Sequence, residues 1–272
     1  MAGFGLAGLF GKWLTLSPLV IVAGRAGFAA LALGLLLAWR RPAQGDSPWA
    51  WRTWWAGAPM GVLLAGHWWT FFQSVQVGTV AVALLSFSTF PVAVLALDAI
   101  LGQGRPRPRD LAAALAALAG VAVIAPRFQL ADASFRGLLW GLASGLAFAA
   151  MVVWNRRQVR HTPPLVLALV QNGVACLVLL PLAAASSSCP PAREWAGLAV
   201  LGVVFTAGTH GLFLQGLRSV PARLASLTCT LEPAYGILAG SLILHEIPGP
   251  RTLLGAAIIL ASVASVSLTR RC

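Results

Sequence analysis

A single glutamate, Glu232, lies in the middle of a long apolar stretch, and its type and setting suggest chemistry. A charge in the core of a bilayer is costly, so an acid placed there needs a reason. Pro233 follows it, removes one backbone hydrogen bond and disfavours helical geometry in the preceding residue. A break there would direct the carboxylate into a cavity, where it could bind a cationic group or a proton. Alternatively, the carboxyl only bonds freed backbone donors or a neighbouring helix.

Two histidines form a second candidate set. His67 and His210 lie in corresponding apolar segments of the two halves of the chain, one residue apart when the halves are aligned. Imidazole changes charge near neutral pH and could carry a coupling proton. The alternative is that each ring only bonds to neighbouring helices.

Aromatic side chains crowd the same segments and could shape a binding cavity. Trp68 and Trp69 follow His67, Phe90 lies at the position equivalent to Glu232, and Tyr235 is the only tyrosine. Rings that face inward would make an apolar cavity for an aromatic or amphipathic solute, or for a cation through the ring faces. The alternative for these residues is ordinary packing within the membrane.

Two basic residues lie near the predicted outer ends of the first two segments. Arg25 and Lys12 could each attract a carboxylate or a phosphate. For both we favour snorkelling to the outer interface, or a salt bridge that locks helices together.

Ten apolar segments must position these side chains, and they form two copies of five. Residues 71–124 align without a gap on 213–266, and 17–27 align on 163–173. An odd number of spans in each copy makes the second copy enter the membrane upside down, which is typical of transporters with a site near mid-membrane. We predict spans near 2–16, 18–39, 54–75, 77–101, 109–126, 135–155, 164–185, 195–217, 220–244 and 251–269.

Composition also indicates a membrane protein. The chain is 58% hydrophobic and 10% charged, whereas soluble domains carry about a quarter charged residues. Most arginines lie between apolar runs on the side that faces the cytoplasm if the N-terminus is inside. The net charge of +12 is therefore a topology signal rather than a nucleic-acid signal. We expect a multi-pass protein of the cytoplasmic (inner) membrane with both termini in the cytoplasm.

Several local patterns together resemble the EamA branch of the drug/metabolite transporter superfamily. They are an arginine early in the second span (SPLVIVAGRAG), a serine-rich stretch ending in proline (LLSFSTFP, 84–91), its counterpart TCTLEP (228–233), and an acid after the ninth span, Glu246 in LILHE. The resemblance implies a carrier that exports amino acids, drugs or other metabolites, or imports small metabolites. One departure is LGQG (101–104), where relatives often have a second glutamate.

These observations predict an all-α integral membrane protein with ten transmembrane helices. Two inverted five-helix repeats, residues 1–127 and 128–272, would enclose a central cavity. Ser86, Ser88 and Thr228 are added as candidate substrate-binding hydroxyls, and Pro91 and Pro233 as hinges. The predicted function is secondary-active or facilitative transport of small metabolites, with export of an amino acid or metabolite by alternating access preferred.

Other functions stay open at this point. An uncoupled facilitator or exchanger fits the scarcity of buried acids, and a lipid-carrier flippase fits the apolar wall. A membrane enzyme fits least, because the four histidines are scattered over different depths. The motif GxxxxGK[ST] is absent and the cysteines lack metal spacing, so we predict no cofactor and no metal. Expected partners are a small-molecule substrate, a proton and membrane lipid, in a monomer or homodimer.

Overall fold

The computed structural model describes residues 2–40, 50–101, 107–124, 129–186, 190–219 and 232–268, and all regular structure in these ranges is helical. The all-α prediction is confirmed for them. The first half contains α1 (Ala2–Ala7), α2 (Phe10–Trp13), α3 (Pro18–Arg40), α4 (Trp51–Val77), α5 (Val80–Phe87), α6 (Phe90–Ile100) and α7 (Pro108–Ile124). The second half contains α8 (Ala133–Gln158), α9 (Pro164–Ser186), α10 (Ala192–Gly202), the π-helix η1 (Val203–Gly208), α11 (Thr209–Ser219), α13 (Glu232–Ile243) and α14 (Pro250–Leu268).

Three of the predicted spans are interrupted in the structure. The first consists of the short helices α1 and α2, joined by a turn at Gly8 and Leu9. The fourth divides into α5 and α6 at Ser88 and Thr89, and the eighth contains η1 between α10 and α11. Apolar runs predict where a chain lies in a membrane, but they do not predict local breaks of the helix within it.

Several helices are suited to a membrane by length and composition. Five stretches of the described residues are long and apolar enough to cross one, which makes the chain a multi-pass membrane protein. They are Pro18–Arg40, Val80–Leu97, Ala133–Gln158, Pro164–Ala185 and Ala192–Arg218. A shorter apolar helix covers Pro250–Ser262. The count of ten crossings stays a prediction.

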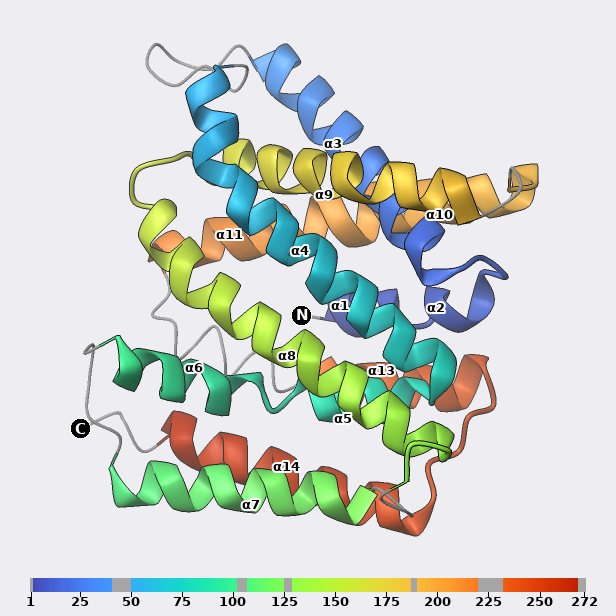
Figure 1. Cartoon of the computed structure of the whole chain (residues 1–272), viewed down its shortest axis with the longest axis vertical. Coiled ribbons are helices and arrows are strands. Elements are labelled where there is room, and N and C mark those ends of the chain that lie inside the picture. Colours follow the sequence, from blue (N-terminus) through green and yellow to red (C-terminus); the bar gives the residue numbers. More distant parts are fainter. Residues whose placement is uncertain are drawn as a thin grey trace.

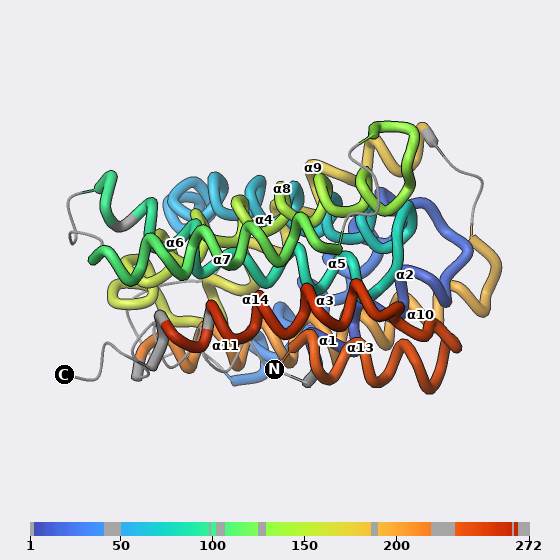
Figure 2. The backbone as a smooth tube through the Cα atoms, turned by 90° about the horizontal axis from the view of Figure 1, so that it is seen from below, coloured from blue at the N-terminus to red at the C-terminus, as the bar shows by residue number. Residues whose placement is uncertain are grey.

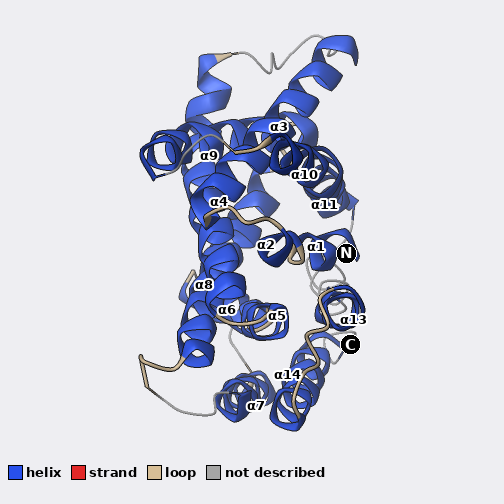
Figure 3. Ribbon diagram, turned by 90° about the vertical axis from the view of Figure 1, so that its right-hand side faces the viewer, coloured by secondary structure: helices blue, strands red, loops and turns tan. Residues whose placement is uncertain are grey.

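Equivalent helices of the two halves pack against each other. α3 packs on α9, and α7 packs on α14 at the bottom of Figure 1. The contact of α1 with α13 corresponds to the contact of α8 with α5 and α6. Viewed from the side in Figure 3, α9, α4, α8 and α7 form one layer, while α10, α11, α13 and α14 lie in the other. The short helices α1 and α2 lie near the middle of the molecule.

The helix ends separate into two sides. The tube in Figure 2 and the ribbon in Figure 1 both have the end of α14 and the start of α7 on one side, opposite the end of α9 and the connection from α13 to α14. The last turns of α8 and α11 carry Arg156, Arg157 and Arg218, and they end on the same side as α14. Basic residues thus gather at one face of the helical layer.

Glycines let α8 approach α4 and α5 very closely. A methyl group on Gly137 would lie 3.2 Å from the Cα of Gly78, and one on Gly145 would lie 3.1 Å from the carbonyl oxygen of Phe87. Between them, a methyl group on Gly141 would overlap the hydroxyl of Ser86. Small residues at four-residue spacing are a common means of helix association in lipid.

A carboxylate from the second half caps a helix of the first half. The Val80 N–H at the start of α5 donates to Glu246 Oε2 at 2.9 Å, and the Val82 N–H donates to Thr79 Oγ1 at 3.1 Å. Unpaired N–H groups at a helix start need such acceptors. Lys12 acts at a neighbouring helix end, because its Nζ donates to the Gly78 carbonyl oxygen at 2.9 Å.

We predict that Glu246→Ala lowers the stability of the purified protein by about 1 kcal/mol, because one N–H of α5 loses its acceptor. Glu246→Gln keeps an amide oxygen at the same place and should lose clearly less. Thermal unfolding in detergent, followed by size-exclusion chromatography of heated samples, compares the two variants. Equal losses would mean that the charge, and not the capping hydrogen bond, stabilises this end.

Candidate functional site

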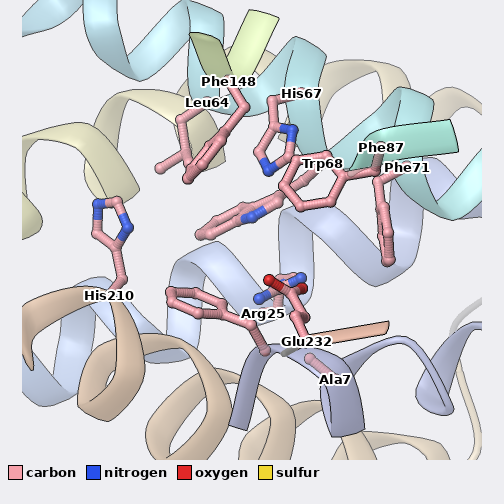
Figure 4. A pocket seen from close by; sticks show the side chains of 11 residues that line it. Ala7, Arg25, Leu64, His67, Trp68, Phe71, Phe87, Phe148, His210 and Glu232 are labelled. Atoms are coloured by element: carbon pink, nitrogen blue, oxygen red, sulfur yellow. The ribbon is translucent and has the colours of Figure 1, made fainter. Parts of the chain in front are cut away.

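A small buried cavity lies at the meeting point of α1, α3, α4, α5, α8, α11 and α13, and Figure 4 shows its side chains. Its free space is about 30 Å³, which is room for about two water molecules. The lining is formed by Phe4, Ala7, Arg25, Leu64, His67, Trp68, Phe71, Phe87, Phe148, His210 and Glu232. Four groups capable of carrying charge therefore meet inside an apolar and aromatic shell.

Arg25 is fixed in the wall of this cavity by a hydroxyl and an aromatic face. Its Nε donates to Thr206 Oγ1 at 2.9 Å, and its Cζ lies 4.0 Å from the centroid of the Trp68 ring. Only 2% of the residue is exposed, and its buried Nη2 atom has no hydrogen-bond partner among the described residues. The snorkelling interpretation was wrong, because ring and hydroxyl hold the guanidinium inside the bundle instead of at the interface.

The hydroxyl that holds Arg25 belongs to the π-helix η1. Thr206 Oγ1 donates to the Leu201 carbonyl oxygen at 2.8 Å, so its lone pairs are free to accept from Arg25. A π-helical turn widens the backbone ladder and is frequent at functional sites. The interruption of the eighth span thus supplies the acceptor that orients the arginine.

His67 is held by α8 in one tautomer. Its Nδ1 lies 2.8 Å from Ser144 Oγ and 3.1 Å from the Ser144 carbonyl oxygen. The Ser144 hydroxyl donates its only hydrogen to the His67 carbonyl oxygen at 3.0 Å. We assign the hydrogen to Nδ1, because the Ser144 carbonyl oxygen can only accept. Nε2 is left as an acceptor, and Figure 4 shows this side of the ring pointing into the cavity.

His210 is oriented by a chain of amides. Its Nε2 lies 3.1 Å from Gln171 Oε1, and Gln171 Nε2 donates to Asn155 Oδ1 at 2.7 Å. With the amide in this orientation, Nε2 carries the hydrogen and Nδ1 is an acceptor. Figure 4 shows His210 on the side of the cavity opposite Phe71, with one ring nitrogen turned inward.

Glu232 enters the cavity from the first turn of α13. It is 6% exposed, and α13 packs so closely on α1 that a methyl group on Gly5 would lie 2.7 Å from the Glu232 carbonyl oxygen. Figure 4 shows the carboxylate on the same side of the cavity as Arg25. Within the described ranges, no ion pair joins Glu232 to a basic side chain.

The structure brings together four of the residues predicted from the sequence, namely Glu232, His67, His210 and Trp68. The remaining candidates do not line this cavity. Trp69 packs on Trp140 with ring centroids 5.4 Å apart, and Phe90 packs behind the lining against Phe87 and Phe148. Tyr235 is 45% exposed. Thr228 lies outside the described residues.

Hydroxyls of the serine-rich stretch bond to their own helix. Ser86 Oγ donates to the Val82 carbonyl oxygen at 2.6 Å, and Ser88 Oγ donates to that of Leu84 at 2.7 Å. Serine commonly makes this bond within a helix. Pro91 follows the turn between α5 and α6, and Pro233 is the second residue of α13. Their bending stays a prediction.

The fold and the buried polar cavity define a class of multi-pass membrane carrier. Residues 1–125 and 135–268 each match the EamA-like transporter family, and the chain belongs to this family. The resemblance seen in the sequence motifs is thereby confirmed.

Named relatives and a solved structure agree with this assignment. The uncharacterized transporter YwfM of Bacillus subtilis (strain 168) is 25% identical over 258 residues, 94% of this chain and 86% of that protein. The threonine/homoserine exporter RhtA of Escherichia coli (strain K12) is 26% identical over 216 residues, 78% of this chain and 70% of RhtA. One crystal structure matches with a TM-score of 0.66 at 21% identity, covering 99% of this chain and 96% of the other, and supports the fold alone.

Proposed function

We propose that the protein is a secondary transporter that exports small metabolites, amino acids above all, across the cytoplasmic membrane by alternating access. The observation that carries the proposal is the cavity itself, in which Arg25, His67, His210 and Glu232 are buried within apolar helices. Ionisable side chains inside a membrane often mark substrate and ion pathways, because burying them in an apolar environment is costly and needs a functional reason. The similarity to a threonine/homoserine exporter supports amino acids as the first class to test.

The proposed architecture is ten spans in two inverted repeats, residues 1–127 and 128–272. The packing of α3 on α9 and of α7 on α14 supports it, because a two-fold axis between repeats brings equivalent helices together. The arginines at the ends of α8 and α11 support a cytoplasmic position for that side and for both termini.

Transport requires the cavity to change size. Its free space of about 30 Å³ is too small for an amino acid, so the cavity must enlarge when a substrate enters. The turn at Ser88 and Thr89 interrupts the fourth span next to the cavity, and Pro91 lacks a backbone N–H to restore the helix. We propose that this turn and Pro233 bend as α5, α6 and α13 move.

Counterflow in liposomes tests the proposal. Purified protein is reconstituted with a trapped panel of amino acids, amines, sugars and nucleosides, and exchange is followed with and without a pH gradient. Saturable movement of an amino acid supports a metabolite carrier, and acceleration by the gradient supports proton coupling. An exchange rate that is the same with and without the pH gradient favours an uncoupled facilitator or exchanger. No saturable movement of any solute in the panel would contradict the proposal and favour a lipid-carrier flippase.

A further inference from the structure

Among the residues that the structure describes, none supplies a matching anion for the buried guanidinium of Arg25. The chain has seven acidic residues, and several of them bond to groups at helix ends or in loops. Asp110 bonds the Arg107 N–H, Asp132 caps α8, Glu194 bonds Thr15, and Glu246 caps α5. Within the described part of the chain, no carboxylate forms an ion pair with Arg25. A buried cation left in this way is costly, and a bound anion would relieve the cost.

The surroundings of Arg25 hold its plane and leave donors available. Trp68 lies against the guanidinium face, and Thr206 accepts from Nε. The Nη2 atom has no acceptor, although the residue lines the cavity. A guanidinium fixed in this way is suited to a carboxylate, because its parallel N–H groups match two carboxylate oxygens.

The same cavity offers acceptors to a positively charged group. Glu232 supplies a carboxyl, and the tautomers of His67 and His210 leave Nε2 and Nδ1 as acceptors. A phosphate would also suit Arg25, but three acceptors around it would disfavour a doubly charged anion. A cation alone would leave Arg25 unpaired.

We infer that Arg25 binds the carboxylate of a zwitterionic α-amino acid, whose ammonium group lies toward Glu232 and the two imidazole acceptors. The inference rests on the proposed transport function and adds the groups that a substrate must carry. The aromatic wall, including Phe87 and Phe148, then contacts the side chain of the amino acid. Substrates that lack either charged group should be moved poorly.

The test compares each amino acid with its methyl ester, which keeps the ammonium group and loses the carboxylate. L-threonine, L-leucine and L-phenylalanine and their esters are offered to proteoliposomes containing wild type, Arg25→Met or Arg25→Lys. Arg40→Met is the matched control, because Arg40 lies in the last turn of the same helix and is exposed. Wild type should prefer the acid. Arg25→Met should move the acid about 30-fold more slowly and change the ester little, which removes the preference.

The outcomes separate the inference from the proposed function. Arg25→Lys keeps the positive charge but loses the paired N–H donors of the guanidinium. This variant should retain the fold and part of the preference for the acid over the ester, even if Arg25→Met is poorly folded. Equal losses for acid and ester in folded Arg25→Lys would make Arg25 structural and overturn the inference. Wild-type protein that moves amines or sugars but no amino acid would overturn the inference and leave a transporter. Wild type that moves no solute would overturn both.

Discussion

Glu232→Gln is expected to lower the transport rate by about 30-fold or more while the protein remains folded. The variant keeps the shape of the side chain but cannot supply a negative charge to a bound cation or exchange a proton. A charge-assisted hydrogen bond contributes about 1.5–3 kcal/mol, which corresponds to about 10- to 150-fold in rate or affinity. Initial rates of counterflow at matched protein content measure the effect.

The fold of this variant needs an independent check, because Glu232 begins α13 beside α1. Monodispersity and thermal unfolding in detergent should match wild type. Glu246→Gln is the control, because it makes the same change in a helix-capping acid outside the cavity. Wild-type transport by a well-folded Glu232→Gln protein would contradict the claim that this carboxyl binds a substrate cation or a proton during transport.

The sequence predicted most helices well, because apolar length is a strong signal in a membrane protein. The run predicted at 18–39 is helix α3, and the run at 164–185 is helix α9. Repeat alignment also put His67 and His210 in corresponding segments, one residue apart, and the structure has both in one cavity. The apolar pattern and the internal repeat each extend over many residues, so a local break in a helix does not remove either signal.

The direction of individual side chains was less predictable. Trp68 and Trp69 are adjacent, yet Trp68 lines the cavity and Trp69 packs on Trp140. Adjacent residues on a helix point about 100° apart, and composition alone does not say which direction is inward. Ser86 and Ser88 could have bound substrate, but a carbonyl one turn earlier was the nearer acceptor.

Arg25 shows why a charge near a helix end was misjudged. Snorkelling is the cheaper state for an arginine with free access to water. In the structure, Arg25 instead donates to Thr206 and lies against the face of the Trp68 ring. Thr206 belongs to a π-helical turn that no sequence pattern predicted. The rule that intramembrane charge is functional by default was the signal that could have selected it.

Gly141→Ala is expected to destabilise the protein by about 2 kcal/mol, a large effect for one methyl group. The new Cβ would overlap Ser86 Oγ and lie 2.9 Å from Ser86 Cβ and 3.1 Å from Ser74 Oγ. Neither α8 nor α5 has free space on that side, so the two helices must separate at the wall of the cavity. Thermal unfolding in detergent measures the loss, and transport should fall with it.

Gly216→Ala is the matched control, because it makes the same change within a helix where no atom lies within 4 Å of the new methyl group. It should be neutral or slightly stabilising, since alanine favours the helix by up to about 1 kcal/mol. Adding Ser86→Ala to Gly141→Ala removes the overlapping hydroxyl and should restore part of the stability. Additive losses in the double variant would show that overlap with the Ser86 hydroxyl is not the cause of the loss at Gly141.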